Sequence, residues 1–181
     1  MHPNPAFRQE PRDRNLAFAR ARGFGILSVN GPEGPLARFH AAGQGTKARA
    51  LLERLATIYP NRLYVELQRH PGPGGALSEP ESLAERGAID LAYEMNLPLV
   101  ATNDVYFPKS DLYEAHDALI CIAEGAYVDQ SQPRRRLTPQ HYFKSEAEMV
   151  ALFADLPEAL ENTVEIAKRC AYAVQKRKPI L

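Results

Sequence analysis

The sequence predicts an α/β fold whose strands run parallel. Three short apolar runs, at residues 24–29, 62–68 and 97–102, are separated by longer segments with apolar side chains at helical spacing. The runs are apolar along their whole length, as expected of strands that helices cover on both faces. A strand, helix, strand order needs a crossover connection, so the strands should be parallel with a right-handed crossover.

Composition excludes several classes of protein. The chain has 181 residues, a length that fits one domain, and its 22 basic side chains balance its 22 acidic ones. Overall charge therefore predicts no affinity for nucleic acid, which only local patches could supply. Two cysteines make neither a disulfide framework nor a zinc cluster. With no apolar stretch of roughly 20 residues and no apolar leader, we expect a cytoplasmic protein without a membrane contact.

The N-terminal part begins with a polar, Pro-rich arm. Residues 1–22 form this arm, and we expect it to be poorly ordered. The run at 24–29 ends in the turn sequence NGPEGP, which predicts a buried strand followed by a loop. A helix should then cover residues 46–59, with Thr46 as its N-cap. These elements open an α/β domain predicted to span residues 23–108.

The second and third strands of this domain frame another helix. After the strand at 62–68, Ser78 and Glu81 have the spacing of a capping box for the next helix. That helix should bury Leu83, Ala88, Leu91 and Met95. The run at 97–102 is the last strand, and it ends on Thr102-Asn103-Asp104. The helix between two strands completes a βαβ unit.

The pattern becomes helical in the final segment, residues 109–181. Ser110 is a plausible cap and Gly125 a stop for the first helix. Two further helices, at 146–153 and 156–171, have start signals at Ser145 with Glu148 and at Asp155 with Glu158. The sequence HYFKS before them is a candidate short strand. The chain ends on an apolar pair without a stop signal, which suggests a cut through a longer protein.

Polar side chains follow two of the predicted strands. Gln68 and His70 come after one strand, and Asp104 and Tyr106 come after the next. The carboxyl ends of parallel strands meet at one edge of a sheet, where functional groups of α/β folds gather. Asp104 is therefore either a site carboxylate or a turn residue that bonds its own backbone. His70 either faces this cleft or is a plain loop histidine beside Pro71-Gly72, and we favour the loop.

The second half of the chain resembles the alpha subunits of bacterial DNA polymerase III, the replicative polymerase. The matching sequence segments are LPLVATNDVYF, DLYEAHDALICIAEG, HYFKSEAEMVALFADLPEALENTVEIAKRC and RKPIL. The third segment is highly specific for this family, because no generic helical pattern requires that sequence. The likeness extends upstream through GPEGPL and LLERLATIYPNRLYVELQRH, over about residues 23–181. It implies the later part of a PHP (polymerase and histidinol phosphatase) domain, a partial distorted β/α barrel followed by a run toward the palm.

The resemblance also implies what has been lost. Active PHP domains hold zinc or manganese at the strand ends with histidine, aspartate, glutamate and sometimes cysteine, and their final ligand pair is Asp-x-His. Here Asp104 matches, but Tyr106 replaces the histidine, and Gly31 stands where active members carry cysteine or histidine. A phenol is a poor substitute for a neutral imidazole, and one carboxylate cannot activate water alone. We expect Asp104 to be a vestigial ligand and the chain to bind no cofactor.

Two functions follow from the resemblance. The first is a fragment of the replicative polymerase that serves as a structural and partner-binding module, for the proofreading exonuclease subunit and other replicase subunits. The alternative is an active PHP-type metal phosphoesterase or 3'-5' exonuclease. Polymerisation would need palm aspartates with two magnesium ions, and the chain contains no Asp-x-Asp pair, so whether it is an enzyme by itself stays open. With the earlier strands missing, an open sheet edge predicts self-association.

A few further side chains have competing interpretations. Arg134, Arg135 and Arg136 form a dense basic run, either a contact for DNA phosphates or a solvated loop. His116 lies on or beside the buried face of its helix, which favours a hydrogen-bonded structural histidine over a ligand. The pair Tyr142-Phe143 either packs in the core or meets a partner, and core packing is favoured.

Overall fold

A computed structural model describes residues 27–28, 34–72, 74–135 and 137–171. The chain divides into two compact units, one of Met1–Leu67 with Leu77–Pro98, the other of Gln68–Ala76 with Leu99–Leu181. The predicted arm at 1–22, the predicted loop residue Gly31 and most of the predicted strand at 24–29 lie outside the described residues. The domain boundary that we placed after residue 108 stays a prediction.

The first unit contains a parallel strand pair. β1 (Leu27–Ser28) pairs with β2 (Leu63–Gln68), and Leu27 lies opposite Leu63. The Val65 N–H in the middle of β2 donates a hydrogen bond of 2.9 Å to the carbonyl of Pro98. The described residues thus have the mixed α/β structure and the parallel strands that the sequence predicts. A PHP-type barrel stays a prediction.

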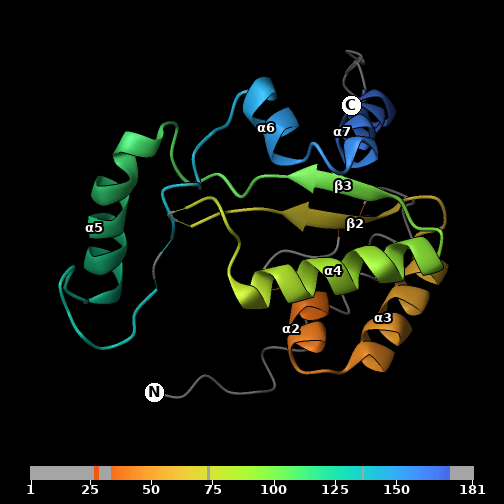
Figure 1. The fold of residues 1–181 in the computed structure, drawn as a ribbon, viewed down its shortest axis with the longest axis horizontal. Helices are drawn as coiled ribbons and strands as arrows, with labels where there is room; N and C mark the ends of the chain where they lie inside the picture. The colour runs from red at the N-terminus through yellow and green to blue at the C-terminus, as the bar shows by residue number, and fades with distance from the viewer. Residues whose placement is uncertain (1–26, 29–33, 73, 136, 172–181) are drawn as a thin grey trace, which may run out of the picture. The chain divides into compact units, whose positions relative to one another are not determined.

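Within its described residues, the first unit also contains the helices α2 (Pro35–Ala41), α3 (Gly45–Ile58) and α4 (Glu79–Glu94) (Figure 1). α2 was not predicted from the sequence, and it packs on both α3 and α4. It approaches α4 closely at Gly87, where an added Cβ would collide with the ring of His40. The prediction of Thr46 as an N-cap is wrong, because α3 begins one residue earlier with Gln44 in that position.

Apolar side chains fill the interior of the first unit. Leu36 of α2, Leu52 of α3 and Val65 of β2 are fully buried. The capping box of α4 is confirmed, since the Ser78 N–H donates to Glu81 Oε2 at 3.1 Å. The expected burial of Ala88 and Leu91 is confirmed, whereas that of Leu83 is wrong, because its side chain is 49% exposed. Met95 is half-buried.

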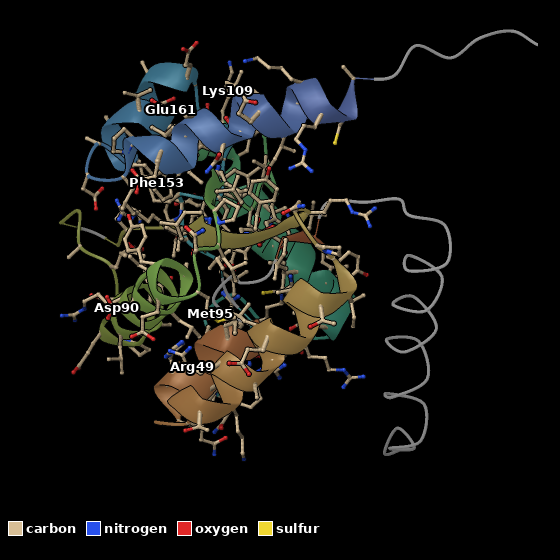
Figure 2. All side chains as sticks on the ribbon, turned by 90° about the vertical axis from the view of Figure 1, so that its right-hand side faces the viewer. Arg49, Asp90, Met95, Lys109, Phe153 and Glu161 are labelled. Atoms are coloured by element: carbon tan, nitrogen blue, oxygen red, sulfur yellow. The ribbon has the colours of Figure 1, made fainter. Side chains whose placement is uncertain are left out.

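Where the structure describes it, the second unit combines a short strand with helices: β3 (Leu99–Thr102), the 3₁₀ turn η2 (Ser110–Leu112), α5 (Tyr113–Glu124), α6 (Glu146–Leu152) and α7 (Pro157–Cys170). α7 packs on β3, and Asn162 Nδ2 donates a 2.8 Å hydrogen bond to the carbonyl of Leu99. Phe153 (Figure 2), directly after α6, is fully buried. The guanidinium Cζ of Arg69 lies 4.6 Å from the centroid of its ring.

Two of the predicted helix boundaries in the second unit are confirmed. Gly125 ends α5 in the left-handed conformation at φ 66°, which a residue without a Cβ adopts freely. Ser145 and Glu148 form the predicted capping box of α6, and the Ser145 N–H donates to Glu148 at 2.7 Å. Both boundaries follow from local chemistry that the sequence displays directly.

Other local predictions for the second unit are wrong. Ser110 lies inside η2 and caps nothing, because Lys109 is in the cap position. Asp155 does not begin α7, since its carboxylate receives hydrogen bonds of 2.6 and 2.8 Å from Arg69. The sequence HYFKS forms no strand of its own, only a bridge between Tyr142 and Phe107. Among the described residues, no helix is long and apolar enough to cross a membrane.

Candidate functional site

The residues that follow β2 and β3 lie together within the second unit, as parallel strands predict. Gln68 Nε2 lies 3.4 Å from Thr102 Oγ1, which joins the ends of the two strands. Beyond these ends, the rings of His70 and Tyr106 both contact His141. We call His70, Tyr106, His116 and His141 the ring cluster.

A stack of two imidazoles forms the centre of the ring cluster. The rings of His70 and His141 are 3.8 Å apart at their centroids and within 3° of parallel. The Thr138 N–H donates to His141 Nδ1 at 3.2 Å and fixes this ring. His70 is only 2% exposed, so the interpretation as a plain loop histidine is wrong. His141 was missed, because nothing in HYFKS distinguishes it from a surface residue.

The geometry of the stack does not suit a shared metal ion. A metal bound to imidazole lies close to the ring plane, about 2.0–2.1 Å from the nitrogen. Since the planes of His70 and His141 are nearly parallel and 3.8 Å apart at their centroids, an ion in one plane lies well outside the other. The described residues contain no group of three or more histidine, cysteine, aspartate or glutamate side chains placed to hold a metal.

Tyr106 lies where the resemblance predicts a histidine ligand, and it acts as an aromatic packing group. Its ring stands edge-on to His116 at 5.6 Å and to His141 at 5.8 Å. Its hydroxyl accepts a 3.3 Å hydrogen bond from Arg135 Nη2, and the same guanidinium lies 5.7 Å from the ring centroid. Edge-on contacts of this kind stabilise aromatic groups by about 0.5–1.5 kcal/mol each.

His116 joins the cluster through ring contacts. It is half-buried on α5, and its ring lies 5.4 Å from that of Phe107. Its Nδ1 atom is buried without a hydrogen-bond partner among the described residues. The expected hydrogen-bonded histidine is therefore not found at this atom, and aromatic packing holds the ring instead.

Asp104 lies in the loop directly after β3 and is half-buried. Nδ2 of its neighbour Asn103 donates a 2.6 Å hydrogen bond to the carbonyl of Tyr142. This bond ties the loop after β3 to the segment before α6. A ligand role for Asp104 stays a prediction.

A buried ion pair joins α5 to the connection that follows it. Arg134 donates from both Nη atoms to the Asp117 carboxylate at 2.7 and 2.6 Å, and each side chain is 6% exposed. Hydrogen bonding to Asp117 raises the pKa of Arg134, which stays charged at every pH of interest. Arg134 also donates to the Val128 carbonyl at 3.1 Å, so the pair secures the loop after α5. Asp117 was missed, although its position one turn before buried Cys121 put a carboxylate on the inner face.

The arginines of the basic run, residues 134–136, have different contacts. Arg134 is engaged with Asp117, whereas Arg135 is exposed and contacts Tyr106. Arg136 lies outside the described residues. Phe143 is 72% exposed, so the expectation that it packs in the core is wrong.

Comparison with known proteins identifies the relatives of this chain. It is 51% identical over 156 residues to DNA polymerase III subunit alpha of Caulobacter vibrioides. The corresponding subunits of Pseudomonas aeruginosa and Pseudomonas fluorescens are 44% identical over 169 residues and 41% identical over 156. The chain is homologous to part of DNA polymerase III subunit alpha. No protein-family model matches it.

The match to DNA polymerase III subunit alpha covers most of this chain and little of the relatives. The alignments include 86% of the chain for Caulobacter and 93% for Pseudomonas aeruginosa. The same alignments span 13% and 14% of the two relatives. The resemblance to DNA polymerase III alpha subunits, inferred from the matching sequence segments, is confirmed.

Proposed function

We propose that this chain is a PHP-type segment of a replicative DNA polymerase III alpha subunit, which is a cytoplasmic protein. In this proposal the segment is a structural and partner-binding module without catalysis of its own. The observation that carries this proposal is the packing of Tyr106. Tyr106 replaces the histidine of the Asp-x-His pair. Its ring stands edge-on to His116 and His141, and its hydroxyl accepts a hydrogen bond from Arg135.

The ring cluster supports this proposal because its rings contact one another by stacking and edge-on packing. Hydrolysis by a PHP site needs several ligands converging on a metal that activates water. Here His70 and His141 stack face to face, and Asp104 has Tyr106 in place of the second ligand of its pair. Side chains at the end of the parallel strands thus serve to hold loops together.

The relatives supply the wider context of the proposal. DNA-templated DNA synthesis with magnesium would be the work of a palm domain, since this chain has no Asp-x-Asp pair. The partners that we propose are the proofreading exonuclease subunit, other replicase subunits and DNA. Of the two arginines of the basic run that the structure describes, Arg134 is paired with Asp117, whereas Arg135 is exposed and contacts Tyr106. We propose Arg135 as the residue of this run that contacts a DNA phosphate.

Hydrolysis of a small phosphodiester, bis(p-nitrophenyl) phosphate, tests the proposal. The chain would be assayed with added Mn²⁺ or Zn²⁺ beside an Asp104→Ala variant. We expect equal rates for both proteins, at the level of the metal alone. Hydrolysis that survives repurification and disappears in Asp104→Ala would overturn the proposal in favour of an active PHP phosphoesterase.

A further inference from the structure

His40 of α2 is packed against the backbone of α4 within the first unit. A Cβ atom added at Gly87 would lie only 2.7 Å from Cγ and from Cε1 of the imidazole, so the ring occupies the space beside this glycine. His40 Nε2 is buried and has no hydrogen-bond partner among the described residues. The ring therefore acts as a packing group between the two helices.

This environment favours the neutral imidazole. A protonated ring carries two N–H donors and a positive charge, whereas a neutral ring carries one donor and no charge. Burying an unpaired charge costs far more free energy than burying an unpaired polar atom. Burial accordingly lowers the pKa of His40 below its usual value of 6.5, and the charge of Asp90 only partly opposes this shift.

The charged groups near His40 do not compensate for a second proton on the ring. Asp90 is exposed and lies one turn after Gly87 on α4, and burial outweighs its charge. Glu94, on the same face of α4, is paired with Arg49 of α3. The neighbouring charge on α2 itself is the cation Arg38. α3 also packs on α2, and its charged side chains are mostly cations: Lys47, Arg49, Glu53 and Arg54.

We propose that His40 is a pH-sensitive lock between α2 and α4, in which the neutral ring holds α2 in place and the protonated ring releases it. In the released state both ring nitrogens can donate to water. Release would also expose Leu36 and Ala37, which α2 now buries. The lock creates an apolar surface at acidic pH, and it does not depend on the proposed partner-binding role.

The pH range of the lock follows from the direction of the shift. Because the pKa of His40 is lower in the packed state than in the released state, α2 is fully held above about pH 6.5 and is released progressively as the pH falls below that value. The other histidines that the structure describes, His70, His116 and His141, lie in the second unit. An effect confined to α2 would therefore report on His40.

Hydrogen exchange of the whole chain, read by mass spectrometry at pH 7.5 and 5.5, tests the lock. After correction for intrinsic exchange rates, peptides that cover α2 should lose protection by about threefold or more at the lower pH. His40→Gln cannot be protonated and should show the same α2 protection at both pH values. Asp90→Asn removes the carboxylate that raises the pKa of His40, so its α2 should lose more protection than that of the wild type.

The dependence of α2 protection on pH is the measured quantity, so a variant of lower overall stability still gives an answer. Equal α2 protection of the wild type at both pH values would overturn the inference. So would an equal loss in His40→Gln, or a smaller loss in Asp90→Asn than in the wild type. A loss of the same size in peptides of β2 would assign the effect to general acid unfolding and overturn it as well.

Discussion

The two compact units are stabilised by different kinds of contact. The first unit has an interior of aliphatic side chains such as Leu36, Leu52 and Val65. The second unit also buries polar groups, namely His70, Asp117 and His141, and each of them contacts a specific partner. An aliphatic interior tolerates exchange between residues of similar volume, whereas a buried polar group depends on one particular partner. The second unit should therefore respond more selectively to substitution.

The largest expected effect separates two phenylalanines of the second unit. Phe153→Ala should lower the free energy of unfolding by about 3–5 kcal/mol, because the side chain is fully buried and its removal leaves a cavity. Phe143→Ala is the matched control, and at 72% exposure it should change stability by less than about 0.5 kcal/mol. Urea denaturation of both variants measures the difference. Similar losses would show that the burial assigned to Phe153 is wrong.

Breaking the ion pairs of the second unit should also lower stability by different amounts, according to how exposed the carboxylate is. Asp117→Asn leaves Arg134 charged and buried, so the melting temperature should fall by roughly 5–10 °C. Asp155 is also paired with arginine, and Arg69 lowers its pKa, but its side chain is 62% exposed. Asp155→Asn should therefore lower stability by only about 0–1 kcal/mol. Thermal unfolding that ranks the two variants in the opposite order would contradict the comparison.

The capping box of α6 should make stability depend on pH. Hydrogen bonds from the Tyr142 hydroxyl, and then from Ser145, lower the pKa of Glu148 from 4.5 to about 2. A lowered folded-state pKa means that the stabilisation is complete above the unfolded value and is lost as the pH falls from about 4.5 toward about 2. Denaturation midpoints between these pH values should fall less in Glu148→Gln than in the wild type. Glu146→Gln, outside the box, should keep the wild-type slope, and a shared slope for all three proteins would rule out the assignment.

The smallest expected effect is that of the Tyr106 hydroxyl. Tyr106→Phe removes the 3.3 Å hydrogen bond from Arg135 but keeps the ring against His116 and His141. Because the bond is exposed, the loss should be below about 1 kcal/mol. Tyr106→Ala removes the ring as well and should lose more. If both variants were equally destabilised, the ring contacts would contribute nothing.

Sequence patterns predicted the features that depend on local chemistry. The capping boxes at Ser78 and Ser145 and the stop at Gly125 follow from the identity of neighbouring residues. The proximity of His70 and Tyr106 followed from the rule that parallel strands end at one edge. Helix α2 was missed, because its seven residues are too short for a clear apolar period.

The contacts missed from the sequence join residues far apart in the chain. The stack of His70 on His141 and the bond from Arg69 to Asp155 depend on how loops pack. Periodicity reports which face of an element is buried, not which partner meets it there. Asp155 shows the consequence, since a residue with the spacing of a helix start instead pairs with an arginine 86 positions away.

Calorimetric titration of the chain with Zn²⁺ and Mn²⁺ tests the central claim most directly, namely that the strand ends carry a packed ring cluster and no metal site. The account predicts no stoichiometric binding to the wild type, and none to Tyr106→His, because a single imidazole does not gather the other ligands. Binding of one ion per chain that is abolished by Asp104→Ala would contradict it.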